Sequence, residues 1–403
     1  MTKYKLAILT SHPIQYQAPL FKKMADNPQL GVVVYFRNRP IEYDREFGRE
    51  LKWDIPLLEG YSSKFLTNKF LIFNELRHGN FDALLIYGWN SWVNWFTVLS
   101  AKVLGVRILM VGENPLNQEL LKPKWKIFIK KILFRKILFP WVSAFLYIGE
   151  ENRRFYKFYG VPDKKLFFAP YAVDNDRFVE SGKLLSENRK SLRKELRIKG
   201  NDVIILFVGK VIGKKRPLDL LKAYHQLTTN NQQLTTKITL LFVGDGILRP
   251  ELENYVKIHN LKNVFFLGFK NQTELPEYYT IADIFVLPSG VGETWGLVVN
   301  EAMCFGLPII VSDVVGCGPD LVKHSENGYI FPVGDIKALA KYLRDLIYGH
   351  SDSFVNSDKF VDSDYGLEKR KKFGKKSFEI IQNYSYEKDV NSILKALTYI
   401  YLY

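Results

Sequence analysis

The sequence contains little cysteine and little histidine. Its 403 residues include two cysteines, Cys304 and Cys317, and six histidines that show no paired spacing. Two cysteines exclude a disulfide-stabilised scaffold and a zinc site built from four cysteines. The histidine spacing argues against a metal centre. We therefore expect neither a metal ion nor a resident cofactor.

Long apolar runs are missing as well. The longest uncharged run, 83–101, contains Gly88, Ser91 and Asn94, which favour a strand, a turn and a helix over a membrane span. The apolar stretch 6–9 is too short for the core of a secretory signal. These absences predict a soluble or peripheral protein of the cytoplasm.

Acidic residues are outnumbered by basic ones. The chain has 57 lysines and arginines against 42 aspartates and glutamates, a net charge of +15. Residues 1–180 hold 27 of the basic and 17 of the acidic residues, so this half alone carries +10. A basic half indicates an anionic partner, which is a nucleic acid, an acidic lipid surface or a phosphorylated substrate.

Short β-branched runs alternate with helical patterns along the chain, as in parallel sheets covered by helices. Strands are predicted at 5–10, 32–35, 83–87, 107–111, 144–148, 203–208, 238–243, 264–267, 284–287 and 309–311. Helices are predicted at 18–24, 92–103, 217–226, 248–258, 297–305 and 336–346. The fold class is therefore α/β, with two Rossmann-like, doubly wound domains that face a central cleft.

The polar stretch 179–200 interrupts this alternation, so we place the domain boundary near residue 180. The first domain covers 1–180 and the second 181–385. Residues 386–403 form a further helix, which we expect to pack back on the first domain. Ligands of such sheets bind at the carboxyl ends of the strands.

A basic, glycine-containing turn follows the predicted strand 203–208. It reads Gly209-Lys-Val-Ile-Gly-Lys-Lys-Arg-Pro217 and leads into a helix. Glycines allow close approach of a ligand, and a helix start favours anions, so Lys210 and Lys215 are candidates for neutralising a pyrophosphate. The alternative is a solvated basic turn. A second glycine turn, Gly244-Asp245-Gly246, follows the next strand.

A glycine-rich loop with a glutamate follows the predicted strand 284–287. Glu293 lies at the entrance of a helix that starts near Gly296, and Glu301 lies two turns along it. The first-turn amides lack helical partners, and a polyhydroxylated ligand would supply partners for both the amides and a buried carboxylate. The alternative is a capping glutamate followed by a solvated one.

These motifs together resemble the GT-B glycosyltransferases of the retaining family 4, also called group 1, of the bacterial polysaccharide type. The resemblance covers most of the second domain and rests on the two glycine turns, Ala282-Asp283, Leu287-Pro-Ser, the Glu293 and Glu301 motif, Gly306-Leu-Pro and Asn327-Gly328. Two positions depart from the family pattern: Lys210 replaces the usual arginine and Arg216 replaces the usual glycine. Lysine lacks the bidentate fork of arginine, so the diphosphate geometry is expected to differ.

The resemblance implies the role of each motif residue. Lys210 and Lys215 would hold the donor diphosphate, Glu293 the donor sugar and Glu301 the nucleotide ribose. The remaining donor contacts are expected at Gly209, Gly244, Asp245, Gly292, Thr294, Trp295, Gly296 and Leu297.

Two loops of the first domain carry candidate acceptor-side residues. The loop after strand 5–10 contains His12, Gln15 and Tyr16, and it is similar to the start of some bacterial polysaccharide glycosyltransferases. Glu113 and Asn114 follow strand 107–111. We expect His12 and Glu113 near the reacting centre. The alternatives are turn hydrogen bonds for His12, and a helix cap or an ion pair for Glu113.

The segment 122–141 carries seven basic residues and no acid, with its aromatic and aliphatic residues on one helical side. A basic amphipathic helix is typical of membrane surfaces. Candidate lipid contacts are Lys124, Trp125, Lys130, Lys131 and Arg135. The alternative is a core-facing helix with a basic outer side.

Two Asp-x-Asp pairs, Asp174-Asn-Asp176 and Asp362-Ser-Asp364, match the metal motif of the other glycosyltransferase fold. Neither follows a strand among the donor motifs, so we expect no metal requirement.

The sequence therefore predicts a hexosyltransferase that moves a sugar from a nucleoside-diphosphate sugar, with UDP favoured and GDP possible. The acceptor is a saccharide or lipid-linked saccharide of the cell surface, at the inner face of the membrane. The alternatives are a UDP-sugar 2-epimerase-like enzyme and a non-catalytic nucleotide-sugar-binding protein. We expect no nucleic-acid partner.

Overall fold

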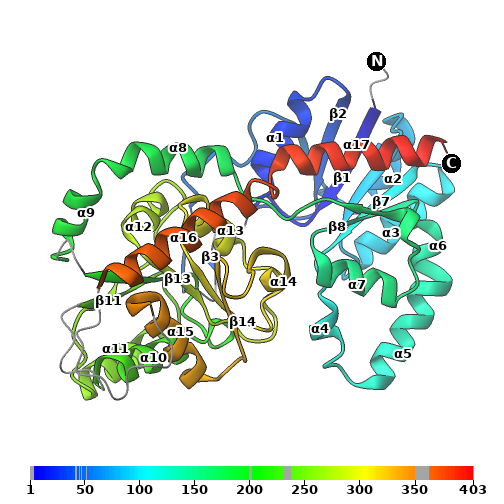
Figure 1. Ribbon diagram of the computed structural model, residues 1–403. Helices are drawn as coiled ribbons and strands as arrows, with labels where there is room; N and C mark the ends of the chain where they lie inside the picture. Colours follow the sequence, from blue (N-terminus) through cyan, green and yellow to red (C-terminus); the bar gives the residue numbers. More distant parts are fainter. Residues whose placement is uncertain are drawn as a thin grey trace. The chain divides into compact units, whose positions relative to one another are not determined.

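The computed structural model describes residues 4–40, 43–44, 46, 48–50, 52–198, 202–229, 237–349 and 363–402. The chain forms two compact units (Figure 1). Unit 1 comprises Met1–Glu42, Ile55–Asp174 and Tyr384–Tyr403, and unit 2 comprises Tyr43–Asp54 and Asn175–Asn383. Asp362 of the second Asp-x-Asp pair lies outside the described residues.

Unit 1 is built on a seven-stranded sheet in the order β5-β2-β1-β6-β7-β8-β9, and every neighbouring pair is parallel. The strands are β1 (Tyr4–Thr10), β2 (Leu30–Phe36), β5 (Ser62–Phe65), β6 (Ala83–Tyr87), β7 (Arg107–Gly112), β8 (Ala144–Tyr147) and β9 (Leu166–Phe168). The helices are α1 (Ala18–Asp26), α2 (Leu71–His78), α3 (Trp92–Val103), α4 (Leu116–Glu119), α5 (Lys124–Leu133), η1 (Phe134–Leu138), α6 (Phe139–Trp141), α7 (Glu150–Phe158), η2 (Asp163–Lys165) and α17 (Tyr386–Leu402).

Unit 2 is built on a six-stranded parallel sheet in the order β12-β11-β10-β13-β14-β15. Its strands are β10 (Val203–Val208), β11 (Ile238–Val243), β12 (Val264–Phe266), β13 (Ile284–Leu287), β14 (Ile309–Ser312) and β15 (Gly328–Phe331), with a separate hairpin of β3 (Tyr43–Asp44) and β4 (Arg49–Glu50). Its helices are α8 (Asn175–Ser186), α9 (Arg189–Glu195), η3 (Gly213–Lys215), α10 (Pro217–Thr229), α11 (Arg249–Ile258), α12 (Leu275–Ile281), α13 (Leu297–Cys304), α14 (Gly318–Leu321), α15 (Ile336–Tyr348) and α16 (Ser363–Ile381).

Both sheets have the Rossmann strand order. Counted along each unit, the strands of unit 2 run 3-2-1-4-5-6, and unit 1 repeats this order with one more strand at its edge. Helices cover both faces of such a parallel sheet. Its strands are therefore continuous apolar runs, without the alternating polar residues of a strand that faces solvent. All six residues of β10 and all six of β11 are buried. The predicted α/β class with two Rossmann-like halves is therefore confirmed.

The transition between the units falls at Asp174, and residue 180 lies inside α8. Helix α8 packs on α12 and α13, and Phe178 lies against the rings of Tyr279 and Phe305. Most of the polar stretch that we expected to mark the boundary lies in α8 and α9, and Arg193 within it is buried. At the other end of the chain, α17 packs on α1, β8 and β9 of unit 1.

Candidate functional site

The site in unit 2 lies at the switch point of its sheet, where the order reverses between β10 and β13. At such a point the loops that leave the two strands run in opposite directions, and ligands of parallel sheets bind beside it. The loop 209–216 follows β10 and the loop 288–296 follows β13. The amide of Gly290 donates to the carbonyl of Lys214 over 2.7 Å and ties the two loops together.

An ion pair joins the same two loops through side chains. The ammonium of Lys215 bonds Oε2 of Glu293, and the hydroxyl of Ser289 donates to that oxygen over 3.0 Å. Glu293 is 8% exposed, and the Lys215 side chain is 14% exposed. The structure therefore brings together two of the residues that the sequence assigned to the donor. Ser289 was missed, although it lies in the same loop.

Lys210, the other basic candidate, has acidic partners. Its ammonium lies 2.8 Å from Asp44 and 2.6 Å from Glu46. Both belong to the segment Tyr43–Asp54, which we call the strap. The strap is also held where Asn271 donates to the carbonyl of Lys52 over 2.7 Å. Nothing in the sequence pattern connects the strap, which lies between β2 and β5, with a loop of unit 2.

Further contacts hold the strap beside the end of β12. The Arg49 guanidinium lies 4.9 Å from the ring centre of Phe269, and Trp53 contacts the same ring edge-on. The amide of Thr273 donates to Asp54 over 3.0 Å. The strap, which is part of unit 2, is therefore held at the loop that follows β10 and at the segment that follows β12.

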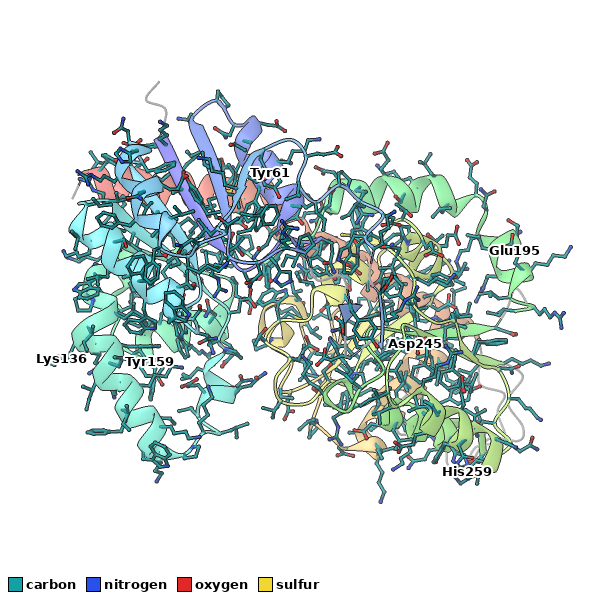
Figure 2. The ribbon with its side chains drawn as sticks, turned by 180° about the vertical axis from the view of Figure 1, so that it is seen from behind. Tyr61, Lys136, Tyr159, Glu195, Asp245 and His259 are labelled. Atoms are coloured by element: carbon teal, nitrogen blue, oxygen red, sulfur yellow. The ribbon has the colours of Figure 1, made fainter. Side chains whose placement is uncertain are left out.

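Glycines bring the loop backbones into close contact. A side chain at Gly244 would place its Cβ 1.9 Å from the carbonyl oxygen of Gly209, and Gly244 has a φ of +132°. A Cβ at Gly316 would lie 1.8 Å from the carbonyl oxygen of Thr294. Asp245 caps its own turn, because its Oδ1 accepts from the amide of Gly246 over 2.9 Å (Figure 2). These glycines are required by packing, whatever ligand binds.

Arg216 occupies the left-handed region, with a φ of +49°. This conformation favours glycine, which is the residue that the family pattern has at this position. The Nε of Arg216 lies 2.6 Å from Asp219. An added Cβ at Gly290 or Gly334 would lie 3.3 Å or 3.0 Å from the Arg216 side chain, so a larger residue at either position would require this side chain to shift. The departure from the family pattern is thus accommodated by neighbouring glycines.

Helix α13 starts directly after this loop. Gly296 has a φ of +101°, and the indole of Trp295 donates to Asn300 over 2.9 Å. Within the described residues, no hydrogen bond uses the amide of Gly296 or Leu297. Glu301 is 0% exposed and accepts from the hydroxyl of Tyr279 over 2.7 Å. The expected solvated alternative for Glu301 is therefore wrong, because this carboxylate is held in the core.

In unit 1, the loop after β1 carries His12, Gln15 and Tyr16. Nδ1 of His12 is 3.0 Å from the hydroxyl of Ser11. Burial and the charge of Arg37 lower the pKa of His12. The carbonyl of Tyr16 accepts from the hydroxyl of Tyr386 over 2.8 Å, which ties this loop to α17.

Glu113, at the end of β7, lines a small cavity in unit 1. It accepts from the hydroxyl of Tyr171 over 3.0 Å, and burial raises its pKa. Asp389, from α17, lines the same cavity, and burial raises its pKa to about 8. The backbone of Asn114, next along the chain, accepts from Asn152 over 3.1 Å. The sequence analysis missed Asp389, because a lone aspartate in the first turn of a helix resembles a capping residue.

The basic segment 122–141 forms α5, η1 and α6, and α5 has no buried residue. Its apolar side chains are exposed: Trp125 by 62%, Phe128 by 65% and Ile129 by 55%. The alternative of a core-facing helix is therefore wrong for α5, but it holds for the rest of the segment, where Phe134, Leu138 and Phe139 are buried in the core. We call this surface the α5 patch, and it comprises Leu120, Leu121, Trp125, Phe128, Ile129, Ile132 and Ile137. The patch lies on a part of unit 1 that projects away from α17 (Figure 1).

Lys130 differs from the other basic residues of the segment. Its ammonium lies 2.9 Å from Glu119, whose other oxygen bonds Lys122 over 2.8 Å. Four rings surround it, those of Trp89, Phe134, Phe155 and Tyr159, at 4.7 to 5.8 Å. Lys130 therefore holds α5 to unit 1. Lys136 lies on the outside of this region and Tyr159 further in (Figure 2). Lys124 and Arg135 are exposed, and Lys131 lies 5.0 Å from the ring of Phe158.

Within the described ranges, no three histidine, cysteine, aspartate or glutamate side chains are grouped so as to hold a metal ion. Among the same residues, no helix has the length and apolar character needed to span a bilayer.

Known proteins resemble both the sequence and the fold. Residues 188–354 match the family model described as glycosyl transferases group 1. The UDP-Gal:alpha-D-GlcNAc-diphosphoundecaprenol alpha-1,3-galactosyltransferase of Escherichia coli is 31% identical over 199 residues, which are 49% of this chain and 48% of that protein. An alpha-1,4-N-acetyl-D-galactosaminyltransferase of Campylobacter jejuni, named for a diNAcBac-PP-undecaprenol-linked acceptor, is 28% identical over 61% of this chain and 60% of its own length. The chain thus matches only about half of the length of these relatives.

The fold likeness extends over the whole chain. The crystal structure of Anabaena Alr3699/HepE in complex with UDP and glucose superposes with a TM-score of 0.69 at 16% identity, and it covers 98% of this chain and 99% of the other. The predicted resemblance to group 1 glycosyltransferases and the predicted GT-B fold are confirmed. Family 4 membership and retention of configuration stay predictions.

The raised pKa of Asp389 predicts a pH-dependent stability. The ordinary pKa of an unfolded aspartate is about 3.9, and that of folded Asp389 is about 8. Between these values the folded chain holds a proton that the unfolded chain lacks, so this group destabilises the fold as pH rises from about 4 to about 8. Asp389→Asn should therefore raise the unfolding temperature by an amount that grows over this window.

The matched control is Glu387→Gln, an exposed acid in the same turn of α17. It should leave the pH profile unchanged. A constant difference between wild type and Asp389→Asn from pH 4 to pH 8 would contradict the assignment.

Proposed function

We propose that the chain transfers a sugar from a nucleoside-diphosphate sugar to a saccharide acceptor, because residues 188–354 match the family model of the glycosyl transferases group 1. The observation that carries this proposal is the Lys215 and Glu293 pair at the switch point of unit 2, beside the start of α13. A lysine and first-turn amides bind phosphate, and a carboxylate accepts hydrogen bonds from sugar hydroxyls.

The donor that we favour is a UDP-sugar. The name of the Escherichia coli relative specifies a UDP-sugar donor, and the Anabaena structure contains UDP and glucose. A GDP-sugar is the alternative. In this proposal the diphosphate contacts Lys215 and the amides of Gly296 and Leu297, and Glu301 contacts the ribose once Tyr279 releases it.

The reaction exchanges two bonds at the anomeric carbon of the sugar. The bond to the β-phosphate oxygen breaks and the nucleoside diphosphate leaves, while the acceptor oxygen bonds the same carbon and releases its proton. Negative charge grows on the leaving diphosphate, and Lys215 and the α13 amides stabilise it from fixed positions. Glu293 holds the sugar as positive charge develops on its ring. Family resemblance supports retention of configuration, and the basic loop provides the charge that a metal would otherwise supply.

We assign the acceptor to unit 1 and infer a lipid-linked saccharide. Both reported relatives are named for undecaprenol-linked acceptors. His12 has a lowered pKa and is therefore neutral near pH 7, so it is suited to accept a proton. Glu113 is held by Tyr171 and is suited to orient a hydroxyl.

The α5 patch supports a peripheral position on the inner face of the cell membrane. Contiguous exposed apolar side chains mark interaction surfaces, and basic residues beside them favour anionic lipid. Each lysine or arginine near such a surface contributes about 1 kcal/mol. Lys130 and Lys122 are paired with Glu119, so the lipid-facing charge is assigned to the other basic residues of the segment, Lys124, Lys126, Lys131, Arg135 and Lys136.

Removing the charge of Lys215 should abolish most of the activity. Lys215→Met should reduce the rate of UDP release from a UDP-sugar, with bacterial lipid extract as acceptor, by roughly 100-fold, because the leaving diphosphate loses its cation. Lys214→Met is the control, because Lys214 is the exposed neighbour in the same loop.

The variant also leaves Glu293 without its cation, so folding must be checked separately. The double variant Lys215→Met/Glu293→Gln removes both charges and should unfold at the wild-type temperature while staying inactive. Near-normal UDP release by Lys215→Met would contradict the phosphate role.

The strap should compete with the donor for Lys210. Its carboxylates neutralise the cation that a diphosphate would use, so Asp44→Asn/Glu46→Gln should strengthen UDP binding by roughly two- to fivefold, the range expected for partly exposed ion pairs. Calorimetric titration measures this. Glu50→Gln, an exposed acid of the same strap, should have no effect. Weaker UDP binding by the double variant would show that the strap supports the donor instead.

The α5 patch should bind anionic vesicles. Sedimentation with phosphatidylcholine vesicles that contain about 30 mol% phosphatidylglycerol should recover the protein, and added salt should weaken the binding. Trp125→Ser/Phe128→Ser should weaken it roughly tenfold. Leu184→Ser, which alters an equally exposed residue of α8, is the control. Unchanged vesicle binding by the patch variant would contradict the assignment of this surface to lipid. Self-association that depends on the patch, without vesicle binding, would show that the patch binds a second copy of this chain instead.

A further inference from the structure

A group of basic side chains lies at the carboxyl edge of the unit 1 sheet, beside the candidate residue His12. It consists of Arg37 after β2 and Lys69 after β5, while His12 follows β1, and these three strands are neighbours in the sheet. The carboxyl ends of parallel strands meet at one edge, so residues far apart in the sequence are brought together.

Backbone and side-chain bonds hold the group in place. The amide of Arg37 donates to the carbonyl of Thr10 over 3.1 Å, and the amide of Asn38 donates to that of Ser11 over 2.8 Å. The Lys69 ammonium donates to the carbonyl of Arg37 and, over 2.8 Å, to that of Leu66. Lys69 therefore holds its charge beside the backbone of Arg37.

The group contains no acid to balance its charge. Among the described residues, neither Arg37 nor Lys69 forms an ion pair, and the buried Nε of Arg37 has no hydrogen-bond partner. Burial lowers the pKa of Arg37, and burial together with the charge of Arg37 lowers the pKa of His12. A partly buried cation without a partner is costly, and a bound anion is one common explanation of such an unsatisfied group.

We propose that Arg37 and Lys69 form an oxyanion site for the phosphate or diphosphate that links the acceptor saccharide to its lipid. A guanidinium binds phosphate through two parallel hydrogen bonds, and a nearby ammonium adds a point charge. The inference rests on the proposed function and specifies its acceptor as a phosphate-linked saccharide. The alternative is that the anion bound here is the diphosphate of the donor.

Calorimetric titration of the full chain with inorganic pyrophosphate, in the presence of saturating UDP, separates the two sources. UDP fills the donor phosphate positions, so any pyrophosphate that still binds does so elsewhere. We expect the wild type to bind one pyrophosphate under these conditions. Arg37→Gln should weaken that binding at least tenfold, and Lys69→Met should weaken it in the same direction. Arg39→Gln, an exposed arginine two residues along the chain, should match the wild type.

Geranyl diphosphate should compete with pyrophosphate in the UDP-saturated protein, because it carries the same diphosphate on a lipid tail. An unchanged unfolding temperature of Arg37→Gln shows that the fold persists. If that variant unfolds, Lys69→Met provides the same test. The site is overturned if pyrophosphate does not bind beside UDP, or if Arg37→Gln binds it as tightly as the wild type.

The acceptor assignment is overturned if UDP displaces the pyrophosphate and Lys215→Met abolishes its binding, since the anion would then occupy the donor position. Failure of UDP itself to bind would contradict the proposed function. Binding of pyrophosphate that depends on Arg37 would remain measurable in that case, so the two failures are distinguishable.

Discussion

The reversal of strand order between β10 and β13 is the constraint on which the candidate donor site depends. It sends the loops after these strands in opposite directions, and the Lys215 and Glu293 ion pair then joins them across the opening. Breaking one partner of a buried pair leaves an uncompensated charge, which costs about 3–5 kcal/mol. The pair therefore holds the two loops together and fixes the position of the Lys215 ammonium, to which an anion can bind.

In unit 1, too, the candidate residues lie at the carboxyl ends of parallel strands. Its sheet repeats the strand order, and polar side chains again gather at the carboxyl ends, with His12 after β1 and Glu113 after β7. The electrostatics differ between the units. Unit 2 pairs its cations with carboxylates, Lys215 with Glu293 and Lys210 with the strap. Unit 1 leaves Arg37 and Lys69 without acidic partners in the described part of the chain, which accounts for our assigning a second phosphate to this unit.

The sequence patterns predicted the features that depend on residues close together in the chain. The strands 203–208, 238–243 and 284–287 have the predicted bounds, because an apolar run enclosed by glycine turns has one stable state. The short edge strands β5, β9 and β15 were missed, although β12, an edge strand of three residues, was predicted. The partners of Lys210 and the position of Asp389 depend on contacts between distant segments. No local signal identifies such contacts.

In our proposal, unit 2 binds a nucleoside diphosphate without a metal. Thermal unfolding in the presence of UDP, GDP, CMP or dTDP, each with and without EDTA, tests it most directly. A ligand at 100 times its dissociation constant adds about 2.7 kcal/mol of stability, a shift of several degrees. The account predicts a shift with one nucleotide, UDP first, that EDTA leaves unchanged. A folded protein whose unfolding temperature none of the four nucleotides alters, or whose shift EDTA removes, would contradict it.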